Sequence, residues 1–358
     1  MATVPVGDPQ SRTMGGNNAD MLLEVKGLKT HFFLQQGIVR AVENVDFSVR
    51  RGQTVGIVGE SGCGKSVMAR SVMSIVPPPG RIVEGEILFH LTQTEGGSTT
   101  KEVVDMAKID PMGDKARSIR GFEISMVFQE PMTSLSPVHS VGDQIMEAIL
   151  LHQEVTKAEA RQIAINTLRQ VGMPDPDRII DRYPHQLSGG MRQRAMIAMA
   201  LSCRPALLIA DEPTTALDVT TQAQILTLMQ GLQEEMGMAI IFITHDLGVI
   251  AQMADYVVVM YLGEVVEMAD VDTIFYDPKH PYTRSLLRSI PMLGRKSAQH
   301  QTSRLTAIRG TVPDPYSIPR GCPFHPRCPQ AIQGVCDTKT PPFLELEGGH
   351  KVRCVLYE

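Results

Sequence analysis

The sequence lacks three features that would place it in large classes of proteins. It has no basic excess, because 34 Lys and Arg residues face 39 Asp and Glu residues for a net charge of −5. This balance argues against nucleic acid as the principal partner. No uninterrupted apolar run approaches the roughly 18 residues of a membrane-spanning helix. Residues 1–20 contain no basic start followed by an apolar core, so we expect no signal peptide. These absences predict a cytosolic chain that meets any membrane through a partner.

Length and composition are those of an ordinary globular protein. Apolar residues make up 43% of the chain and charged residues 20%, both close to the averages for globular domains. A chain of 358 residues is long enough for two domains, or for one large domain with an appendage. Residues 1–20 are polar and rich in Gly, Pro and Asn, so we expect a disordered tail there.

One short segment carries the strongest motif. Residues 59–66 fit the pattern G-x-x-x-x-G-K-[ST] at every fixed position, between an apolar strand pattern over 54–58 and a helical pattern over 67–73. In such a loop the backbone N–H groups and the helix N-terminus face an anion, the Lys reaches the β- and γ-phosphates, and the Ser binds Mg²⁺. A Gly-rich turn that binds nothing is the alternative, and the flanking elements disfavour it. The predicted phosphate-binding residues are Gly59, Glu60, Ser61, Gly62, Cys63, Gly64, Lys65, Ser66 and Val67.

Two acids follow a second strand pattern. Residues 207–210 are continuously apolar, as in parallel strands that are covered on both faces, and Asp211 and Glu212 come next. At the end of such a strand Asp211 is placed to hold Mg²⁺ through water. Glu212 points elsewhere and is the natural general base for an attacking water. Earlier in the chain, Leu187-Ser188-Gly189-Gly190 opens a helical pattern, and glycines at a helix start make a further anion site.

With these motifs in this order, the chain resembles an ATP-binding-cassette (ABC) ATPase over most of residues 22–270. The resemblance implies an α/β fold of the P-loop NTPase type, with a mixed sheet core, an antiparallel β subdomain and a helical subdomain. It also implies ATP and Mg²⁺ as cofactors. The matching segments after the phosphate loop are Gln129 behind a strand, Leu187–Gly190, Asp211-Glu212, Ala216-Leu217-Asp218 and His245.

The resemblance implies a role for each matched residue. Gln129 would bind Mg²⁺ and sense the γ-phosphate, and His245 would bind the γ-phosphate and orient the water, so both join Glu212 and Lys65 as catalytic residues. Two cassettes of this kind dimerise head to tail. The segment Ser188-Gly189-Gly190 would therefore bind the γ-phosphate of the partner chain, with Asp218 at the interface. The implied Mg²⁺ ligands are Ser66, Gln129 and Asp211.

An aromatic pair, Phe32 and Phe33, precedes the phosphate loop. One ring could stack on the adenine base, or both rings could fill the core of a small sheet. Of the two, we take Phe32 as the candidate for adenine stacking.

The signature segment departs from the commonest pattern, because Met191 stands where Gln is usual. Met is usual in the peptide-transporter ATPases, which residues 129–137 and 280–283 also resemble.

This resemblance to peptide-transporter ATPases implies the ATP-hydrolysing subunit of an importer at the cytoplasmic face of the inner membrane. Its partners would be a second ABC ATPase, as a paralogue in a heterodimer, two permease subunits and, indirectly, a solute-binding protein. Peptides lead as the transported solute, and nickel, glutathione, opine-like or sugar solutes stay open. The alternative is a soluble ABC ATPase that acts on nucleic acid or ribosomes, but the chain has no long coiled-coil insertion and no second cassette.

Four of the six cysteines lie near the end of the chain: Cys322, Cys328, Cys336 and Cys354. In a reducing compartment thiols suggest metal rather than disulfides. The short Cys-x₂₋₄-Cys spacing of zinc sites is absent, whereas a four-thiolate iron–sulfur cluster tolerates wider spacing and often has Pro after a ligand. The tail also resembles the C-terminal region of peptide-transporter ATPases, some of which carry a [4Fe–4S] cluster. We prefer that cluster, with zinc bound by Cys and His325 as the second interpretation and free thiols as the third.

Composition divides the chain. We expect an ABC ATPase domain over 21–275, with its helical subdomain at about 137–200, and a small Cys-rich extension over 276–358. The polar stretch 92–118 is interpreted as a surface excursion between strands. Because the extension lies beyond the last nucleotide motif, we expect its role to be structural and catalysis at the phosphate loop to be independent of it.

Overall fold

The computed structural model describes residues 20–95, 98–129, 134–215, 217–289 and 308–358. Several sequence-based expectations fall outside these ranges. They are the disordered tail up to residue 19, residues 130–133 of the peptide-transporter segment, and Ala216.

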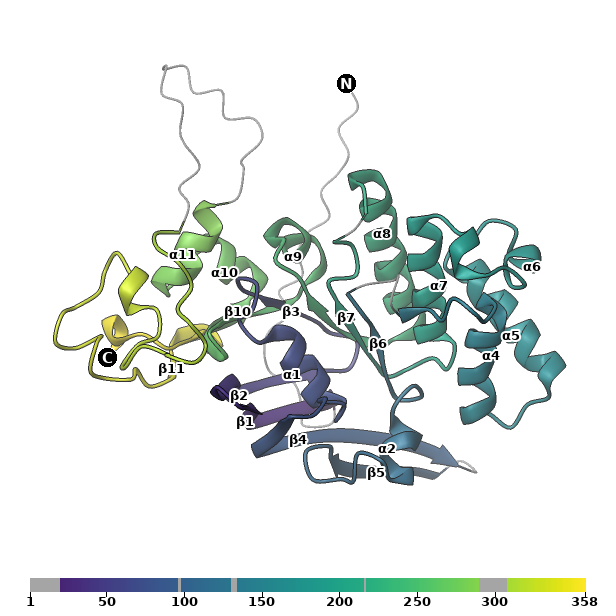
Figure 1. The fold of residues 1–358 in the computed structure, drawn as a ribbon, viewed down its shortest axis with the longest axis horizontal. Coiled ribbons are helices and arrows are strands. Elements are labelled where there is room, and N and C mark those ends of the chain that lie inside the picture. Colours follow the sequence, from purple (N-terminus) through teal and green to yellow (C-terminus); the bar gives the residue numbers. More distant parts are fainter. Residues whose placement is uncertain (1–19, 96–97, 130–133, 216, 290–307) are drawn as a thin grey trace, which may run out of the picture.

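A small antiparallel sheet forms the first layer, shown in purple and blue in Figure 1. Its central strand pairs with both neighbours, so that Val25 lies opposite Phe47 on one side and Ile87 on the other. These apolar side chains are buried on one face, as alternation along a half-buried strand requires. The strands, in the order β2-β1-β4-β5, are β2 (Gly37–Arg50), β1 (Met21–Leu34), β4 (Gly80–Glu95) and β5 (Ser98–Asp105).

The interpretation of residues 92–118 as a surface excursion was wrong. This stretch completes β4 and contains β5 and the short helix α2 (Asp114–Ile119). β-branched residues favour a strand here, and Val104 is buried while Val103, on the opposite face, is exposed. β5 is the edge strand of the small sheet, and its polar composition gave no indication of a strand.

A second sheet of eight strands forms the centre of the molecule. Five parallel strands, β9-β3-β8-β7-β6, make its core, and antiparallel strands continue from β9. Every residue of β3, β7 and β8 is buried, as expected for parallel strands covered on both faces. The strands are β3 (Thr54–Val58), β6 (Ile124–Val127), β7 (Leu207–Asp211), β8 (Ala239–Ile243), β9 (Tyr256–Tyr261), β10 (Glu264–Asp270), β11 (Leu344–Glu345) and β12 (Lys351–Val352).

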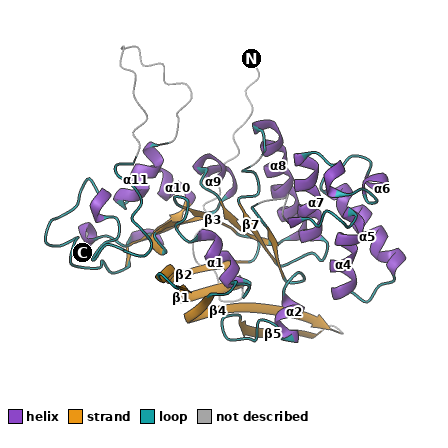
Figure 2. Cartoon of the chain, viewed as in Figure 1, coloured by secondary structure: helices purple, strands orange, loops and turns teal. Residues whose placement is uncertain are grey.

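Helices cover the central sheet. Helices α4 to α7 lie together at one side of the molecule, and the C-terminus lies at the opposite side (Figure 2). Local signals set several of their starts. Thr156 and Glu159 form a capping box before α5, and Ser140 caps α4. Besides α2, the α-helices in the described ranges are α1 (Lys65–Val72), α4 (Val141–His152), α5 (Lys157–Gln170), α6 (Pro176–Ile179), α7 (Gly189–Leu201), α8 (Val219–Met236), α9 (Leu247–Met253), α10 (Val271–Tyr276) and α11 (Pro281–Arg288).

Two hydrophobic cores lie on opposite faces of the central sheet. Along β8, Ile240 and Phe242 join the core under the helices, whereas Ile241 and Ile243 join the core between the two sheets. The period of two in a strand produces this division. The fold is thus the predicted α/β class, with a mixed sheet, an antiparallel sheet and a helical region.

The C-terminal extension, residues 276–358, is joined to the central sheet. Its strand β12 pairs with β10, with Glu267 opposite Val352. The Glu267 carboxylate is fully buried and accepts hydrogen bonds from the backbone N–H groups of Lys279 and His280 at 2.5 and 3.0 Å, and it lies 2.7 Å from His350 Nε2. One buried carboxylate therefore ties three parts of this end of the chain together.

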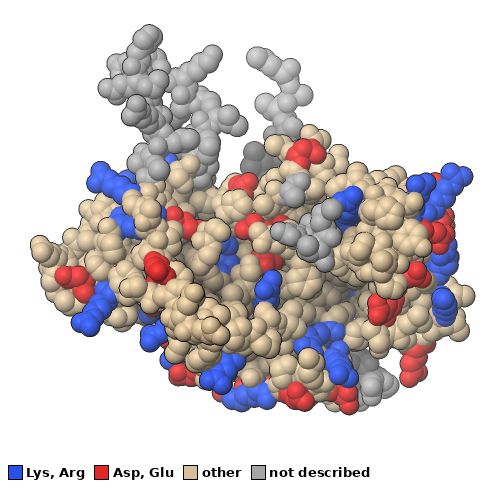
Figure 3. Space-filling model, viewed as in Figure 1, with Lys and Arg blue, Asp and Glu red and all other residues tan. Residues whose placement is uncertain are grey.

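Charged residues of both signs are interspersed over the face of the molecule that Figure 3 shows. None of the helices in the described ranges combines the length and the apolar character needed to cross a membrane.

Candidate functional site

The phosphate loop has the predicted setting, between β3 and the start of α1. Its glycines are needed for space as well as for conformation. A Cβ at Gly64 would lie 2.1 Å from the Ala41 carbonyl oxygen, and the residue has φ of 101°. A Cβ at Gly59 would lie 2.2 Å from the Met260 carbonyl oxygen. Only glycine lets this loop pack directly on neighbouring backbone.

Lys65 and Ser66 point into the loop region. Lys65 is 5% exposed, and its ammonium donates to the carbonyl oxygens of Gly59 at 2.8 Å and Glu60 at 3.1 Å. Ser66 Oγ donates to Asp211 Oδ1 at 3.1 Å. Burial raises the pKa of Asp211, and the hydrogen bond from Ser66 opposes that shift. A hydroxyl and a carboxylate side by side supply the hard oxygen ligands that Mg²⁺ prefers.

Glu212 contacts two other predicted catalytic residues, Gln129 and His245. Its Oε2 accepts hydrogen bonds from Gln129 Nε2 at 3.1 Å and Thr215 Oγ1 at 2.9 Å, and its Oε1 lies 3.3 Å from His245 Nδ1. The backbone of Glu212 has φ of 48°, in the left-handed region that non-glycine residues rarely adopt. Such strained residues cluster at functional sites, where the surrounding structure holds them.

A pocket of about 300 Å³ lies against the phosphate loop, Gln129 and Glu212. Besides the loop, Gln129 and Glu212, its walls come from β2, from the turn after β9 and from the C-terminal extension. Its lining residues are Val39, Arg40, Ala41, Ser61, Gly62, Gly64, Lys65, Ser66, Val67, Gln129, Glu212, Leu262, Gly263, Pro315 and Ile318. Asp211 lies behind it, bonded to Ser66. The structure therefore brings the motifs of residues 59–66, 129, 211–212 and 245 together.

The predicted signature residues are not among those that line this pocket. Ser188 caps α7, and its Oγ accepts from the Met191 N–H at 3.3 Å. Asp218 caps α8, where it accepts from the Thr221 N–H at 3.0 Å, and this bond lowers the pKa of Asp218. Each is thus fixed at a helix start and separate from the loop of its own chain.

Phe32 also lies apart from the pocket lining. A Cβ placed on Gly80 would meet the Phe32 ring at 2.6 Å, so the ring packs closely against that glycine. The Phe33 ring is covered by the guanidinium of Arg81 at 4.2 Å from the ring centroid. Both rings belong to β1 and contact residues at the start of β4.

The four cysteines of the extension border one small cavity, together with His280, Phe324 and His325. Cys328 Sγ accepts from the Gln330 N–H at 3.4 Å, and Cys336 Sγ accepts from the Ile332 N–H at 3.3 Å. Burial raises the pKa of Cys322 to about 12. Over the described part of the chain, no three His, Cys, Asp or Glu side chains are arranged to hold a metal ion as they stand.

Sequence reasoning missed three contacts of the site. Thr215 bonds the predicted base, and the Glu60 carboxylate and N–H contact Arg327 and Tyr282 of the extension. Thr215 could have been found from its place three residues after Glu212. The contacts of Glu60 span more than two hundred residues, and no local pattern indicates them.

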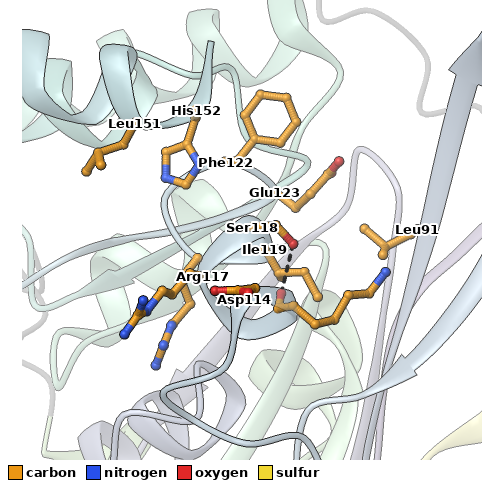
Figure 4. A pocket seen from close by; sticks show the side chains of 11 residues that line it. Leu91, Asp114, Arg117, Ser118, Ile119, Phe122, Glu123, Leu151 and His152 are labelled. Carbon is orange, nitrogen blue, oxygen red and sulfur yellow. Dashed lines mark hydrogen bonds between the residues drawn. The ribbon is translucent and has the colours of Figure 1, made fainter. Parts of the chain in front are cut away.

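A separate pocket of about 650 Å³ lies between α2 and the end of α4 (Figure 4). The Phe122 ring stacks on His152, with Leu151 beside it, and charged residues such as Asp114 and Arg117 make its rim. It contains none of the predicted nucleotide residues.

Comparisons with known proteins match both parts of the chain. The family profile described as ABC transporter matches residues 42–215, and that described as oligopeptide/dipeptide transporter, C-terminal region, matches residues 266–336. The oligopeptide transport ATP-binding protein AppD of Bacillus subtilis is 48% identical over 338 residues, which are 94% of this chain and 97% of AppD. The dipeptide transport ATP-binding protein DppD of Escherichia coli is 46% identical over 333 residues, 93% of this chain and 96% of DppD.

Among solved structures, the dimeric post-hydrolysis state of the ATP-binding cassette MJ0796, bound to ADP and Pi, aligns with a TM-score of 0.59 and 26% identity. The alignment covers 70% of this chain and 99% of that cassette. A cassette alone therefore accounts for part of the chain, whereas AppD and DppD match it nearly from end to end.

Proposed function

The chain belongs to the ABC transporter family, among the ATP-binding subunits of oligopeptide and dipeptide importers, and from that premise we propose how its residues divide the work. It is an ATPase whose hydrolysis is coupled to solute import. The observation that carries the residue assignment is the convergence of Gln129, Thr215 and His245 on Glu212, beside the Ser66–Asp211 pair.

Lys65, Ser66 and Asp211 form the nucleotide-holding side of the site. Bound Mg²⁺·ATP supplies the γ-phosphoryl group and the metal charge that such transfers require. Ser66 and Asp211, with Gln129, would hold the Mg²⁺. The Lys65 ammonium, now bonded to loop carbonyls, would turn to the β- and γ-phosphates of ATP.

Glu212 is the general base in this proposal, and its neighbours hold it in place. One carboxylate oxygen accepts from Gln129 and Thr215, and the other faces His245. The oxygen facing His245 takes a proton from the attacking water, and His245 orients that water. Three partners on one carboxylate limit its motion, and positioning of this kind is a large part of general base catalysis.

Ser188, Gly189, Gly190 and Asp218 serve the site of a partner cassette. Their absence from the pocket lining of their own chain supports this assignment. Ser188 and Asp218 start α7 and α8, so the helix termini that face the partner carry partial positive charge suited to a phosphate.

We propose that this partner is a paralogous ATPase and that the pair sits on two permease subunits at the cytoplasmic face of the inner membrane. A solute-binding protein would deliver the solute, with peptides as the leading class. The pocket between α2 and α4 is the candidate permease contact, because the exposed Phe122 and Leu151 both line it among charged residues. Nucleic acid is not among the proposed partners.

Co-purification tests this proposal. A tagged full-length chain drawn from detergent-solubilised membranes should bring a second ATPase and two permeases with it. The purified assembly should hydrolyse ATP only when Mg²⁺ is present, and the same assembly with Lys65→Ala should not. Recovery of ribosomes or nucleic acid in place of permeases would contradict the importer assignment.

We also propose a [4Fe–4S] cluster on Cys322, Cys328, Cys336 and Cys354. The support is that all four thiols border one cavity and that two of the sulfurs already accept backbone N–H bonds, as cluster thiolates do. Protein purified without oxygen should be brown, with about four irons per chain. A colourless protein with one zinc would indicate the Cys and His325 alternative, and a protein free of metal would indicate free thiols.

A further inference from the structure

Arg327, in the C-terminal extension, makes a two-pronged ion pair with Glu60, the second residue of the phosphate loop. Its Nη1 lies 2.6 Å from Glu60 Oε2, and its Nη2 lies 2.9 Å from Glu60 Oε1. The Arg327 side chain is 4% exposed and that of Glu60 is 23% exposed, so the pair is shielded from water mainly on the arginine side. Paired forks of this kind fix orientation as well as charge.

The Arg327 guanidinium makes further contacts besides its ion pair with Glu60. Its Nε donates to the Arg309 carbonyl oxygen at 3.0 Å, and its Nη1 also lies 3.3 Å from the Tyr261 hydroxyl. The guanidinium stands 5.9 Å from the centroid of the Phe324 ring, which packs against Tyr261. The extension therefore presents a preorganised cation to the loop.

The loop backbone is held at the same residue. The Glu60 N–H donates to the Tyr282 hydroxyl at 2.8 Å, and Tyr282 is fully buried against Tyr261 and Phe324. Both the side chain and the backbone of Glu60 thus depend on residues beyond position 275. A pocket of about 460 Å³ next to them is lined by Glu60, Arg327 and His245.

Electrostatics gives this contact a consequence for the nucleotide. Glu60 places a negative charge inside a loop that binds a triphosphate, and an anion there would repel the ligand. Arg327 neutralises it, and Glu60 lines the neighbouring pocket with Arg327 and is not among the residues that line the pocket beside Lys65 and Ser66. We propose that Arg327 is a positioning residue of the phosphate loop, through which the C-terminal extension sets the affinity of the cassette for ATP. This inference rests on the proposed function, since it requires that the loop binds ATP.

The matched control is Arg353, a second buried arginine of the same extension. It is 8% exposed, donates from Nε to the Val265 carbonyl oxygen at 3.1 Å and lies 3.7 Å from Glu264. It therefore holds the extension to the central sheet without touching the loop. Arg353→Met removes a buried arginine from the same extension while Arg327 and Glu60 stay paired beside the loop.

The test is calorimetric titration of the full-length chain with Mg²⁺ and the non-hydrolysable analogue AMPPNP. We expect Arg327→Met to weaken binding about tenfold, within the usual range for coupled sites, and Arg353→Met to leave it within about twofold of the original chain. Adding Glu60→Gln to Arg327→Met should restore most of the affinity, because it removes the uncompensated charge. A merely structural arginine would show no such rescue.

Two results overturn the inference: unchanged affinity in Arg327→Met, or a loss that Glu60→Gln does not reverse. If Arg327→Met does not fold, Arg327→Lys replaces it, because lysine keeps the charge but not the fork. It should weaken binding about threefold, and unchanged affinity there also overturns the inference. Failure of the proposed function gives a different pattern, in which the original chain does not bind AMPPNP and Lys65→Ala behaves identically.

Discussion

The phosphate loop and the C-terminal extension reach a fixed geometry by opposite means. The loop is a short connection between a buried strand and a helix, and its shape follows from glycines packed on neighbouring backbone. Beyond α11, the described part of the extension has two two-residue strands and several short turns, and buried polar contacts at Glu267 and Arg327 hold it to the cassette. A local sequence motif marks the first kind of structure, whereas no local motif marks the contacts that hold the second.

The two regions should therefore respond differently to substitution. Changes at the loop and at the acids beside it should alter the rate of hydrolysis. Changes in the extension that disturb Arg327 should alter how tightly the loop holds nucleotide.

The largest expected effect is that of Glu212→Gln. Glutamine fits the same space and can still pair with Gln129 and Thr215, but it cannot accept the proton of the attacking water. Loss of a general base costs about 10²–10⁴ in rate, so steady-state hydrolysis by the assembled complex should fall by that factor. Nucleotide binding should persist and trap a closed dimer, which size-exclusion chromatography with ATP would show. A loss of less than about tenfold would place the base elsewhere.

Ser188→Arg comes next. A large cation at the start of α7 should block closure on the partner's γ-phosphate, with a loss of about 10² or more in rate, similar to that for removing a transition-state contact. AMPPNP binding by the isolated subunit should not change, because Ser188 lies outside its own pocket. Ser140→Arg is the control, since Ser140 caps α4 with the same kind of bond. Equal loss of affinity in the isolated subunit would contradict the composite site.

Thr215→Val should have the smallest effect. It removes one hydrogen bond to Glu212 and leaves the bonds from Gln129 and His245. A single hydrogen bond contributes about 0.5–1.5 kcal/mol, so the rate of hydrolysis should fall about two- to tenfold with little change in nucleotide affinity. Thr215→Ser, which keeps the hydroxyl, should behave like the original chain. A drop as large as that of Glu212→Gln would show that Thr215 has a larger role than holding the base.

Sequence patterns predicted the cassette fold because short, contiguous motifs mark it. The loop over 59–66 and the acids after 207–210 lie at strand ends, and parallel strands bring those ends to one edge of the sheet. The same reasoning failed for 92–118, where an exposed edge strand carries polar residues. It also gave no sign of the contact between the loop and the extension, because the Glu60–Arg327 pair joins residues 267 positions apart. Neither residue belongs to a pattern that predicts the other.

If the extension and the phosphate loop behave as one unit, hydrogen exchange should show it. Cys336→Ser, compared with the original full-length chain, should loosen the buried turns that present Arg327. We predict faster amide exchange across residues 59–66 together with the extension, and unchanged exchange in α5, which lies in the helical region. Faster exchange in residues 308–358 alone, with the loop as protected as before, would contradict the account.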